Sequence, residues 1–216
     1  MVLIVQKKPS KLDLLECYGI LHGLVDAFPI NSYLEIGVRE GASLICALAK
    51  EKAVAEFALL CLADGQNQLT KEIINRVANG FTTRNKDLQI YLFDNWTYLG
   101  NEGAHERVRD LLEHGFKTRN FNIYDGDSKV TVPKFFESHT DKIDLAFIDG
   151  DHTWEGATAD LENVWSHSKI IVFHDLFHPQ YPLLETLFIN FAKAHNLPYV
   201  ILGRGVLGTG VAFNIW

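Results

Sequence analysis

The chain has 216 residues, of which 47% are hydrophobic, and a formal net charge of −7. This length supports one sizeable core, the 14 phenylalanines disfavour disorder, and the lack of a basic block disfavours a nucleic-acid-binding protein. No apolar run is long enough for a membrane span and the three cysteines lack metal-ligand spacing, so we expect one cytoplasmic domain with reduced thiols and no membrane partner.

The first part of the chain predicts helices around one strand. An apolar helical period ends before Pro29, and a glycine-containing turn follows the first β-like run. The expected elements are an N-terminal helical cap within residues 1–30, a strand over Tyr33–Val38, a helix that begins near Ala42, and a helical insertion over residues 53–87. Within the insertion, Val54–Asp64 could instead be a strand that ends in Asp64, but alanine and leucine dominate it and favour a helix.

The second part of the chain alternates strands with helices. The expected strands are Leu88–Phe93, Phe121–Tyr124, Leu145–Ile148, Lys169–Phe173, Tyr199–Leu202 and Val211–Ile215, and the expected helices are Glu102–His114, Val132–Ser138, Gly156–Trp165 and Leu183–His195. This alternation predicts an α/β, Rossmann-like doubly wound sheet of about seven strands with helices on both faces. The short connection between the last two strands makes them an antiparallel pair in an otherwise mostly parallel sheet.

Polar side chains gather where three of the buried strands end. Leu145–Ile148 runs into Asp149-Gly150-Asp151-His152, Ile170–Phe173 runs into His174-Asp175, and the first strand carries Glu35 before Gly37. In open α/β sheets, ligands bind outside the carboxyl ends of the strands. We therefore expect these groups to meet at one edge of the sheet and to form the functional site.

Three motifs resemble a known family. They are Glu35-Ile36-Gly37-Val38-Arg39-Glu40-Gly41-Ala42-Ser43, Ile148-Asp149-Gly150-Asp151-His152-Thr153-Trp154-Glu155-Gly156, and Ile171-Val172-Phe173-His174-Asp175. They are similar to the EIGxxxGxS, IDGDHxYEG and VVFHD segments of class I S-adenosylmethionine-dependent methyltransferases, in the small-domain group that resembles sugar and natural-product O-methyltransferases. The resemblance covers roughly residues 33–52 and 88–216, and residues 53–87 have no counterpart in it.

The resemblance implies a set of cofactor-binding residues. Gly37 and Gly41 would let the backbone approach S-adenosylmethionine, whereas a dinucleotide site would want G-x-G-x-x-G. Glu35 beneath the turn would suit the cationic amino-acid end of the cofactor, directly or through water, and Asp94 would accept the ribose hydroxyls, with Asp64 as its rival. The full expected set is Glu35, Gly37, Gly41, Ser43, Asp94, Asp127, Ser128 and Asp149, of which Asp127 and Ser128 would face the adenine edge or simply form an Asx turn.

The same resemblance implies a catalytic cluster. His152 is expected to act as general base, with Asp151 as the second candidate and Asp149 facing both cofactor and metal. Asp149 and Asp175 fit Mg²⁺ or another divalent metal, and His174 would either join them or form hydrogen bonds. Whether the reaction uses a metal stays open at this stage.

The expected function is O-methylation of a hydroxyl on a small-molecule or sugar acceptor. One alternative is a non-catalytic protein that binds S-adenosylmethionine or a nucleoside, and another is a metal-dependent hydrolase. The sequence does not decide between a monomer and a homo-oligomer.

Overall fold

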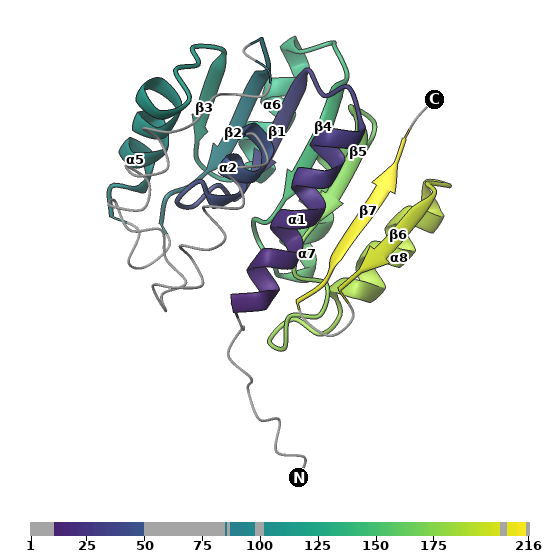
Figure 1. Cartoon of the computed structure of the whole chain (residues 1–216). Coiled ribbons are helices and arrows are strands. Elements are labelled where there is room, and N and C mark those ends of the chain that lie inside the picture. Colours follow the sequence, from purple (N-terminus) through teal and green to yellow (C-terminus); the bar gives the residue numbers. More distant parts are fainter. Residues whose placement is uncertain (1–10, 50–84, 86, 98–101, 204–206, 215–216) are drawn as a thin grey trace.

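The computed structural model describes residues 11–49, 85, 87–97, 102–203 and 207–214 (Figure 1). The expected insertion over residues 53–87, including Asp64, therefore lies outside the described residues except for Asn85 and Asp87, as do residues 1–10 of the expected cap. Among the described helices, none combines the length and the apolar composition that crossing a membrane requires.

One seven-stranded sheet forms the centre of the molecule. Its strand order is β3-β2-β1-β4-β5-β7-β6. The first five strands pair in parallel, and β7 lies antiparallel between β5 and β6. The bounds are β1 Ser32–Ile36, β2 Gln89–Asp94, β3 Phe121–Asp125, β4 Ile143–Ile148, β5 Ser168–Phe173, β6 Tyr199–Leu202 and β7 Thr209–Phe213. The predicted Rossmann-like sheet with an antiparallel end is confirmed.

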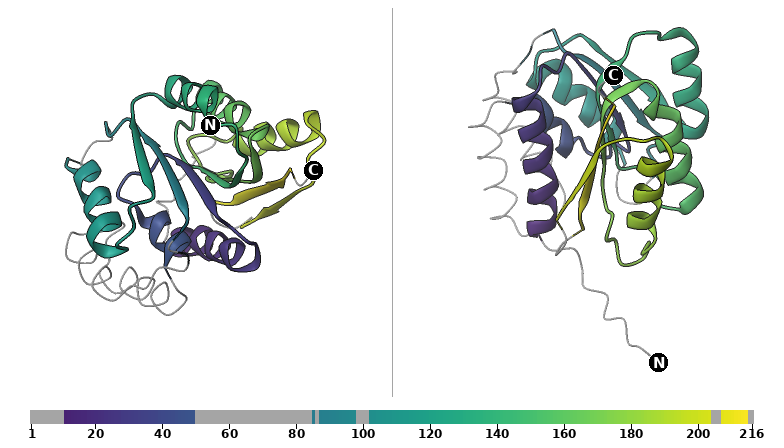
Figure 2. Two further views of the ribbon diagram at one scale, coloured as in Figure 1. Left: turned by 90° about the horizontal axis from the view of Figure 1, so that it is seen from above. Right: turned by 90° about the vertical axis from the view of Figure 1, so that its right-hand side faces the viewer.

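Helices cover both faces of this sheet, as the two views of Figure 2 show. The helices on one face are α1 Lys11–Ala27, α2 Ala42–Leu48 and α5 Ala104–Asp110; those on the other are α6 Ser128–Ser138, α7 Trp154–Trp165 and α8 Leu184–Ala194. Side chains alternate between the two cores, so Tyr33 packs under α1 and α2 whereas Leu34 and Ile36 pack against the opposite layer. All six residues of β4 are buried because both of its faces are covered.

Several element bounds differ from the expected ones, and two of the helices begin earlier because a polar side chain caps them. Asp127 accepts the backbone N–H of Lys129, so α6 begins at Ser128 rather than at Val132. Thr153 accepts the N–H of Gly156, so α7 begins at Trp154 rather than at Gly156. The helix expected over residues 102–114 is α5 followed by a π-helical turn, Leu111–Gly115, and β7 begins two residues before the expected Val211.

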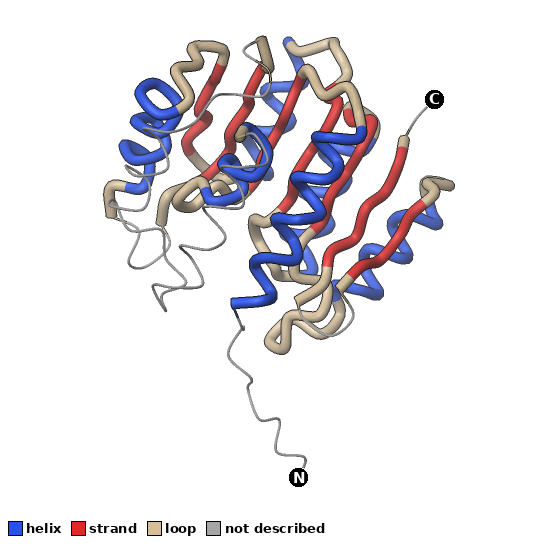
Figure 3. Tube along the Cα trace, in the orientation of Figure 1, coloured by secondary structure: helices blue, strands red, loops and turns tan. Residues whose placement is uncertain are grey.

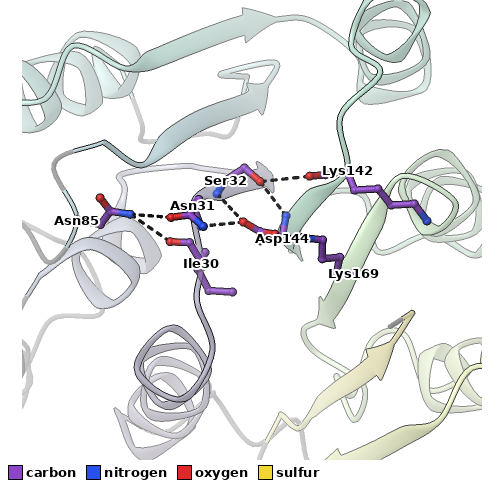
Figure 4. A network of polar contacts seen from close by, with 7 residues as sticks. All are labelled: Ile30, Asn31, Ser32, Asn85, Lys142, Asp144 and Lys169. Carbon is purple, nitrogen blue, oxygen red and sulfur yellow. Dashed lines mark hydrogen bonds and ion pairs between the residues drawn. The ribbon is translucent and has the colours of Figure 1, made fainter. Parts of the chain in front are cut away.

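A polar network centred on Asp144 joins the amino ends of three strands, opposite the candidate site (Figure 4). The Oδ2 atom of Asp144 accepts the backbone N–H groups of Asn31 at 2.8 Å and Ser32 at 3.2 Å. Its Oδ1 atom lies 2.5 Å from Nζ of Lys169, and its own N–H donates to the Ser32 hydroxyl. Because these residues begin β1, β4 and β5, the network fixes the strands relative to one another.

Candidate active site

The candidate site lies at the carboxyl ends of the parallel strands, at the lower edge of the sheet in Figure 1. Figure 3 shows the loops that lead from these strand ends toward the following helices. Ile148 of β4 pairs with Phe173 of β5, so the residues that follow the two strands leave the sheet side by side. This register brings Asp149 and His152 close to His174 and Asp175, which lie 25 and 23 residues further along the chain.

Two imidazoles link the two carboxylates of this cluster. Nε2 of His152 lies 3.0 Å from Oδ2 of Asp175 and 3.4 Å from Oδ1 of Asp149. Nδ1 of His174 lies 3.1 Å from Oδ1 of Asp149 and 3.2 Å from Oδ1 of Asp175. His174 is the more buried imidazole, and its Nε2 atom has no hydrogen-bond partner among the described residues. The arrangement is therefore a ring of alternating acidic and basic groups, with His152 on its outer side.

The pKa values of the ring reflect this mutual pairing. Burial alone would raise the pKa of Asp149, but His174 and His152 lower it below its usual value. Burial alone would lower the pKa of His152, but its contacts with Asp149 and Asp175 raise that pKa to about 10. Burial likewise opposes the charged form of His174, and Cys17 together with the two carboxylates raises its pKa well above the usual value. Both imidazoles consequently carry protons at neutral pH when no other cation neutralises the carboxylates.

Three of these side chains could hold a metal ion. One ligand atom from each of Asp149, His152 and Asp175 can be chosen so that all three lie within 4.8 Å of one another. Two carboxylate oxygens and one imidazole nitrogen are ligands that divalent first-row metals accept. His174 also lies beside both carboxylates, but it is the more buried imidazole. The structure thus adds His152 to the expected acidic ligands, and His174 pairs with the same two carboxylates from the inner side.

Aromatic side chains stand beside the outer imidazole. The ring centroid of Tyr181 lies 5.6 Å from that of His152, with the planes inclined by 26°, and His178 lies 5.8 Å from His152. Tyr181 and Leu183, which follow β5, and Trp154, which begins α7, all keep large exposed surfaces. A site that leaves aromatic and apolar surface next to polar groups is suited to an organic ligand.

The glycine turn after β1 lies directly against the end of β4. Gly37 has φ +87°, and a Cβ atom built on it would overlap the backbone carbonyl of Asp149. Its N–H donates to the carbonyl of Phe93 at 2.9 Å. Gly41 also has a positive φ, +77°, at the start of α2. Glycine is therefore required at position 37 because the ends of β1 and β4 approach each other closely, and any larger residue there would displace Asp149.

Glu35 does not reach the edge of the sheet where its carboxylate was expected. It is fully buried within β1, and its two oxygens accept hydrogen bonds from the hydroxyls of Tyr33 and Ser43. Burial raises the pKa of Glu35 to about 8, although both hydrogen bonds lower it. Glu35 and Ser43 therefore satisfy each other beneath α2 and are not presented to a ligand, because the side chain of Glu35 alternates with that of Leu34 into the core.

Asp94 lies at the expected place, at the end of β2. Its Oδ2 atom accepts the backbone N–H of Arg39 at 2.8 Å, and its Oδ1 atom accepts that of Trp96 at 2.7 Å. The indole N–H of Trp96 donates in turn to Asp125, the last residue of β3. Asp94 thus ties the glycine turn to the loop after β2, and each of its oxygens keeps a further lone pair for a ligand hydroxyl.

Asp127 and Ser128 lie after β3, at the start of α6. Asp127 acts as the N-cap of α6. The Ser128 hydroxyl donates to Oδ1 of Asp160 at 2.6 Å and is therefore directed toward α7. Asp160 was not among the predicted site residues. It lies on the helix that follows the Asp149–His152 motif, and this proximity was the one signal in the sequence that could have identified it. Tyr181 was also missed as an individual residue.

Comparisons with known proteins agree with this geometry. A family profile described as a methyltransferase domain matches residues 34–176. No curated protein matches the chain. Among solved structures, CalS11, a TDP-rhamnose 3'-O-methyltransferase of calicheamicin biosynthesis, is 21% identical with a TM-score of 0.59, covering 97% of this chain and 81% of that chain.

Two further structures share the fold. An O-methyltransferase from Bacillus cereus in complex with SAH is 13% identical with a TM-score of 0.60, covering 98% of this chain and 94% of that one. TomG from Streptomyces achromogenes, an O-methyltransferase of tomaymycin synthesis in complex with SAM, is 13% identical with a TM-score of 0.56, covering 99% and 93%. The prediction of a methyltransferase is confirmed by the profile match over residues 34–176, and the chain belongs to the methyltransferase-domain family.

Proposed function

We propose that this protein transfers the methyl group of S-adenosylmethionine to a hydroxyl of a small-molecule or sugar acceptor. The observation that carries this proposal is the convergence of Asp149, His152 and Asp175 at the strand ends of a methyltransferase sheet, next to the Gly37 turn. Deprotonation and orientation of a hydroxyl are what such a reaction needs beyond the positioning of the cofactor. The solved O-methyltransferases of the same fold support the choice of oxygen as acceptor.

The cofactor would lie across the ends of β1, β2 and β4. Asp94 would accept ribose hydroxyls, because its carboxylate is already fixed by two backbone N–H groups and has acceptor capacity left. The glycine turn at Gly37 and Gly41 would border the amino-acid end, and the loop at Asp127 would border the adenine. In this assignment Glu35, Ser43 and Ser128 support the site from inside the fold rather than contacting the cofactor.

A divalent metal fits the ring of acidic and basic groups. Asp149, His152 and Asp175 would hold it, and a bound metal of this kind lowers the pKa of a coordinated hydroxyl and orients it. Mg²⁺ prefers oxygen ligands alone, so an imidazole in the set favours Mn²⁺ or another transition metal. In that state His152 would be neutral, and the cation would replace the imidazolium charge that now balances the two carboxylates.

The geometry favours Asp151 over His152 as the general base. Nε2 of His152 is occupied by Asp149 and Asp175, so it cannot also accept a substrate proton. Asp151 lies in the same loop with an exposed side chain; its Oδ1 atom accepts the N–H of Thr153, and its Oδ2 atom lies against Gly156 at the start of α7. The proton of the acceptor hydroxyl would pass to Asp151 while the hydroxyl oxygen attacks the methyl group in line with the departing sulfur.

Methyl transfer to a panel of acceptors tests this function. The purified chain would be incubated with S-adenosylmethionine carrying a labelled methyl group, Mn²⁺ or Mg²⁺, and sugar nucleotides, phenols, thiols and amines in separate reactions. The proposal expects labelled ether products and S-adenosylhomocysteine with a hydroxyl acceptor. Transfer only to thiol or amine acceptors would contradict the assignment to O-methylation.

A further inference from the structure

A fully buried carboxylate on α7 touches two loops of the candidate site. Oδ1 of Asp160 accepts the Ser128 hydroxyl at 2.6 Å, in the segment that follows β3. Its Oδ2 atom faces the segment that follows β4, where a Cβ built on Gly150 would lie only 3.0 Å from it. One side chain therefore contacts both the start of α6 and the residue between Asp149 and Asp151.

The burial of this carboxylate works against stability. Burial raises the pKa of Asp160 to about 6, although the Ser128 hydroxyl and the backbone N–H of Asp151 lower it, and the carboxylates of Asp151 and Asp127 raise it further. Its Oδ2 atom has no hydrogen-bond partner among the described residues. A buried polar atom without a full set of partners costs free energy, so an apolar residue would pack α7 at a lower cost. The placement of Asp160 calls for a role besides packing.

We infer that Asp160 is a positioning residue for cofactor binding. It accepts the Ser128 hydroxyl and lies against the backbone at Gly150 and Asp151, and through these contacts it sets the position of the Asp127 loop relative to the Asp149–Asp151 loop. The two loops would border opposite parts of the cofactor, so their spacing determines how well it binds. This inference rests on the proposed function, and Asp160 itself does not touch the cofactor.

The test is the affinity for S-adenosylhomocysteine, measured by calorimetry on the full chain. Asp160→Ala removes both contacts and should raise the dissociation constant about tenfold, which equals about 1.4 kcal/mol. With a working acceptor, the KM for S-adenosylmethionine should rise similarly, while kcat at saturating cofactor stays within about threefold. Ser128→Ala should weaken binding in the same direction, and the double variant should bind no more weakly than Asp160→Ala alone, because both changes remove one linkage.

Two control variants separate positioning from a loss of stability. Asp144→Asn disturbs another carboxylate that joins segments distant in the sequence, at the opposite end of the sheet. Ser138→Ala removes a hydroxyl at the other end of α6, where it donates only to the carbonyl of Phe135. A purely structural role for Asp160 would make its variant behave like Asp144→Asn, with a lower melting temperature and an unchanged dissociation constant.

Asp160→Asn provides a milder variant should Asp160→Ala not fold. The amide keeps an acceptor for Ser128 but turns its NH₂ group toward the backbone N–H of Asp151, so it should weaken binding by about threefold. The inference is overturned if the wild type binds S-adenosylhomocysteine and both Ser128→Ala and Asp160→Asn bind it equally well. Absence of binding by the wild type would overturn the proposed function and this inference together.

Discussion

Nε2 of His152 lies 3.0 Å from Oδ2 of Asp175, and this contact joins the loop after β4 to the end of β5. Asp175 holds its carboxylate there with a left-handed backbone, φ +59°, a conformation that aspartate adopts more readily than most non-glycine residues. The contact neutralises one carboxylate of a close pair. A divalent cation bound between these two side chains and Asp149 would replace this contact.

Asp175→Asn should weaken the binding of Mn²⁺. The substitution removes one negative charge and one strong oxygen ligand from the set of three, so the affinity should fall by at least about tenfold. Titration with Mn²⁺, followed by electron paramagnetic resonance of the free ion, measures this directly. His178→Ala is the matched control, because His178 neighbours His152 without belonging to the set. Equal Mn²⁺ affinity in wild type and Asp175→Asn would show that the acidic pair does not bind metal.

Asp151→Asn should lower kcat by about 10²–10⁴-fold, the usual contribution of a general base, with little change in cofactor affinity. His152→Ala should behave differently, because it removes a metal ligand rather than the base. Its activity should recover at high Mn²⁺ concentration, whereas that of Asp151→Asn should not. If Asp151→Asn keeps wild-type kcat and His152→Ala cannot be rescued, His152 is the base, as the sequence alone suggested.

Glu35 should make the fold less stable as the pH rises. Its folded pKa of about 8 exceeds the ordinary 4.5, so between these values the folded chain binds a proton that the unfolded chain has released. The resulting stability is complete below about pH 4.5 and is lost as the pH approaches 8, by up to about 1.4 kcal/mol per pH unit. Glu35→Gln keeps a neutral side chain in the core. Its unfolding free energy, measured in urea between pH 5 and 8, should therefore decline less steeply than that of the wild type. Identical slopes would indicate that Glu35 is ionised inside the fold.

Asp144→Asn should destabilise the fold without touching the site. The amide oxygen can keep the two N–H groups that Oδ2 accepts, but the NH₂ group then faces the ammonium of Lys169, so the ion pair is lost at a cost of about 1 kcal/mol. The loss should appear as a lower urea midpoint, with the affinity for S-adenosylhomocysteine unchanged. A large loss of affinity would mean that the amino and carboxyl ends of the sheet are coupled.

The mostly parallel sheet with its antiparallel end could be predicted because buried parallel strands appear as continuous apolar runs, whereas the order of the strands came only from the structure. Leu145-Ala146-Phe147-Ile148 and Ile170-Ile171-Val172-Phe173 are such runs, and both are fully buried. The polar residues that follow these runs, Asp149 and His174-Asp175, indicated the site because ligands bind at the carboxyl ends of parallel strands. The expected starts of α6 and α7 were too late because no helix start was assigned to the Asx turn at Asp127 or to the hydroxyl of Thr153.

Side-chain direction could not be predicted from position in the sequence. Glu35 precedes the glycine turn and was expected at the sheet edge, but the two-residue period of β1 directs it into the core. The Ser128 hydroxyl was expected to face the cofactor, yet it bonds to Asp160, which lies 32 residues further on. The contact between His152 and Asp175 depends on the register of β4 with β5, which a single sequence does not reveal.

The binding of S-adenosylhomocysteine by the full chain is the most direct test of this account. Isothermal titration calorimetry should show one site per chain with a dissociation constant in the micromolar range, about 8 kcal/mol of binding free energy. Asp94→Ala should weaken that binding strongly, because Asp94 is the carboxylate assigned to the ribose. No heat of binding and no thermal shift with either S-adenosylhomocysteine or S-adenosylmethionine would contradict the proposed methyl transfer.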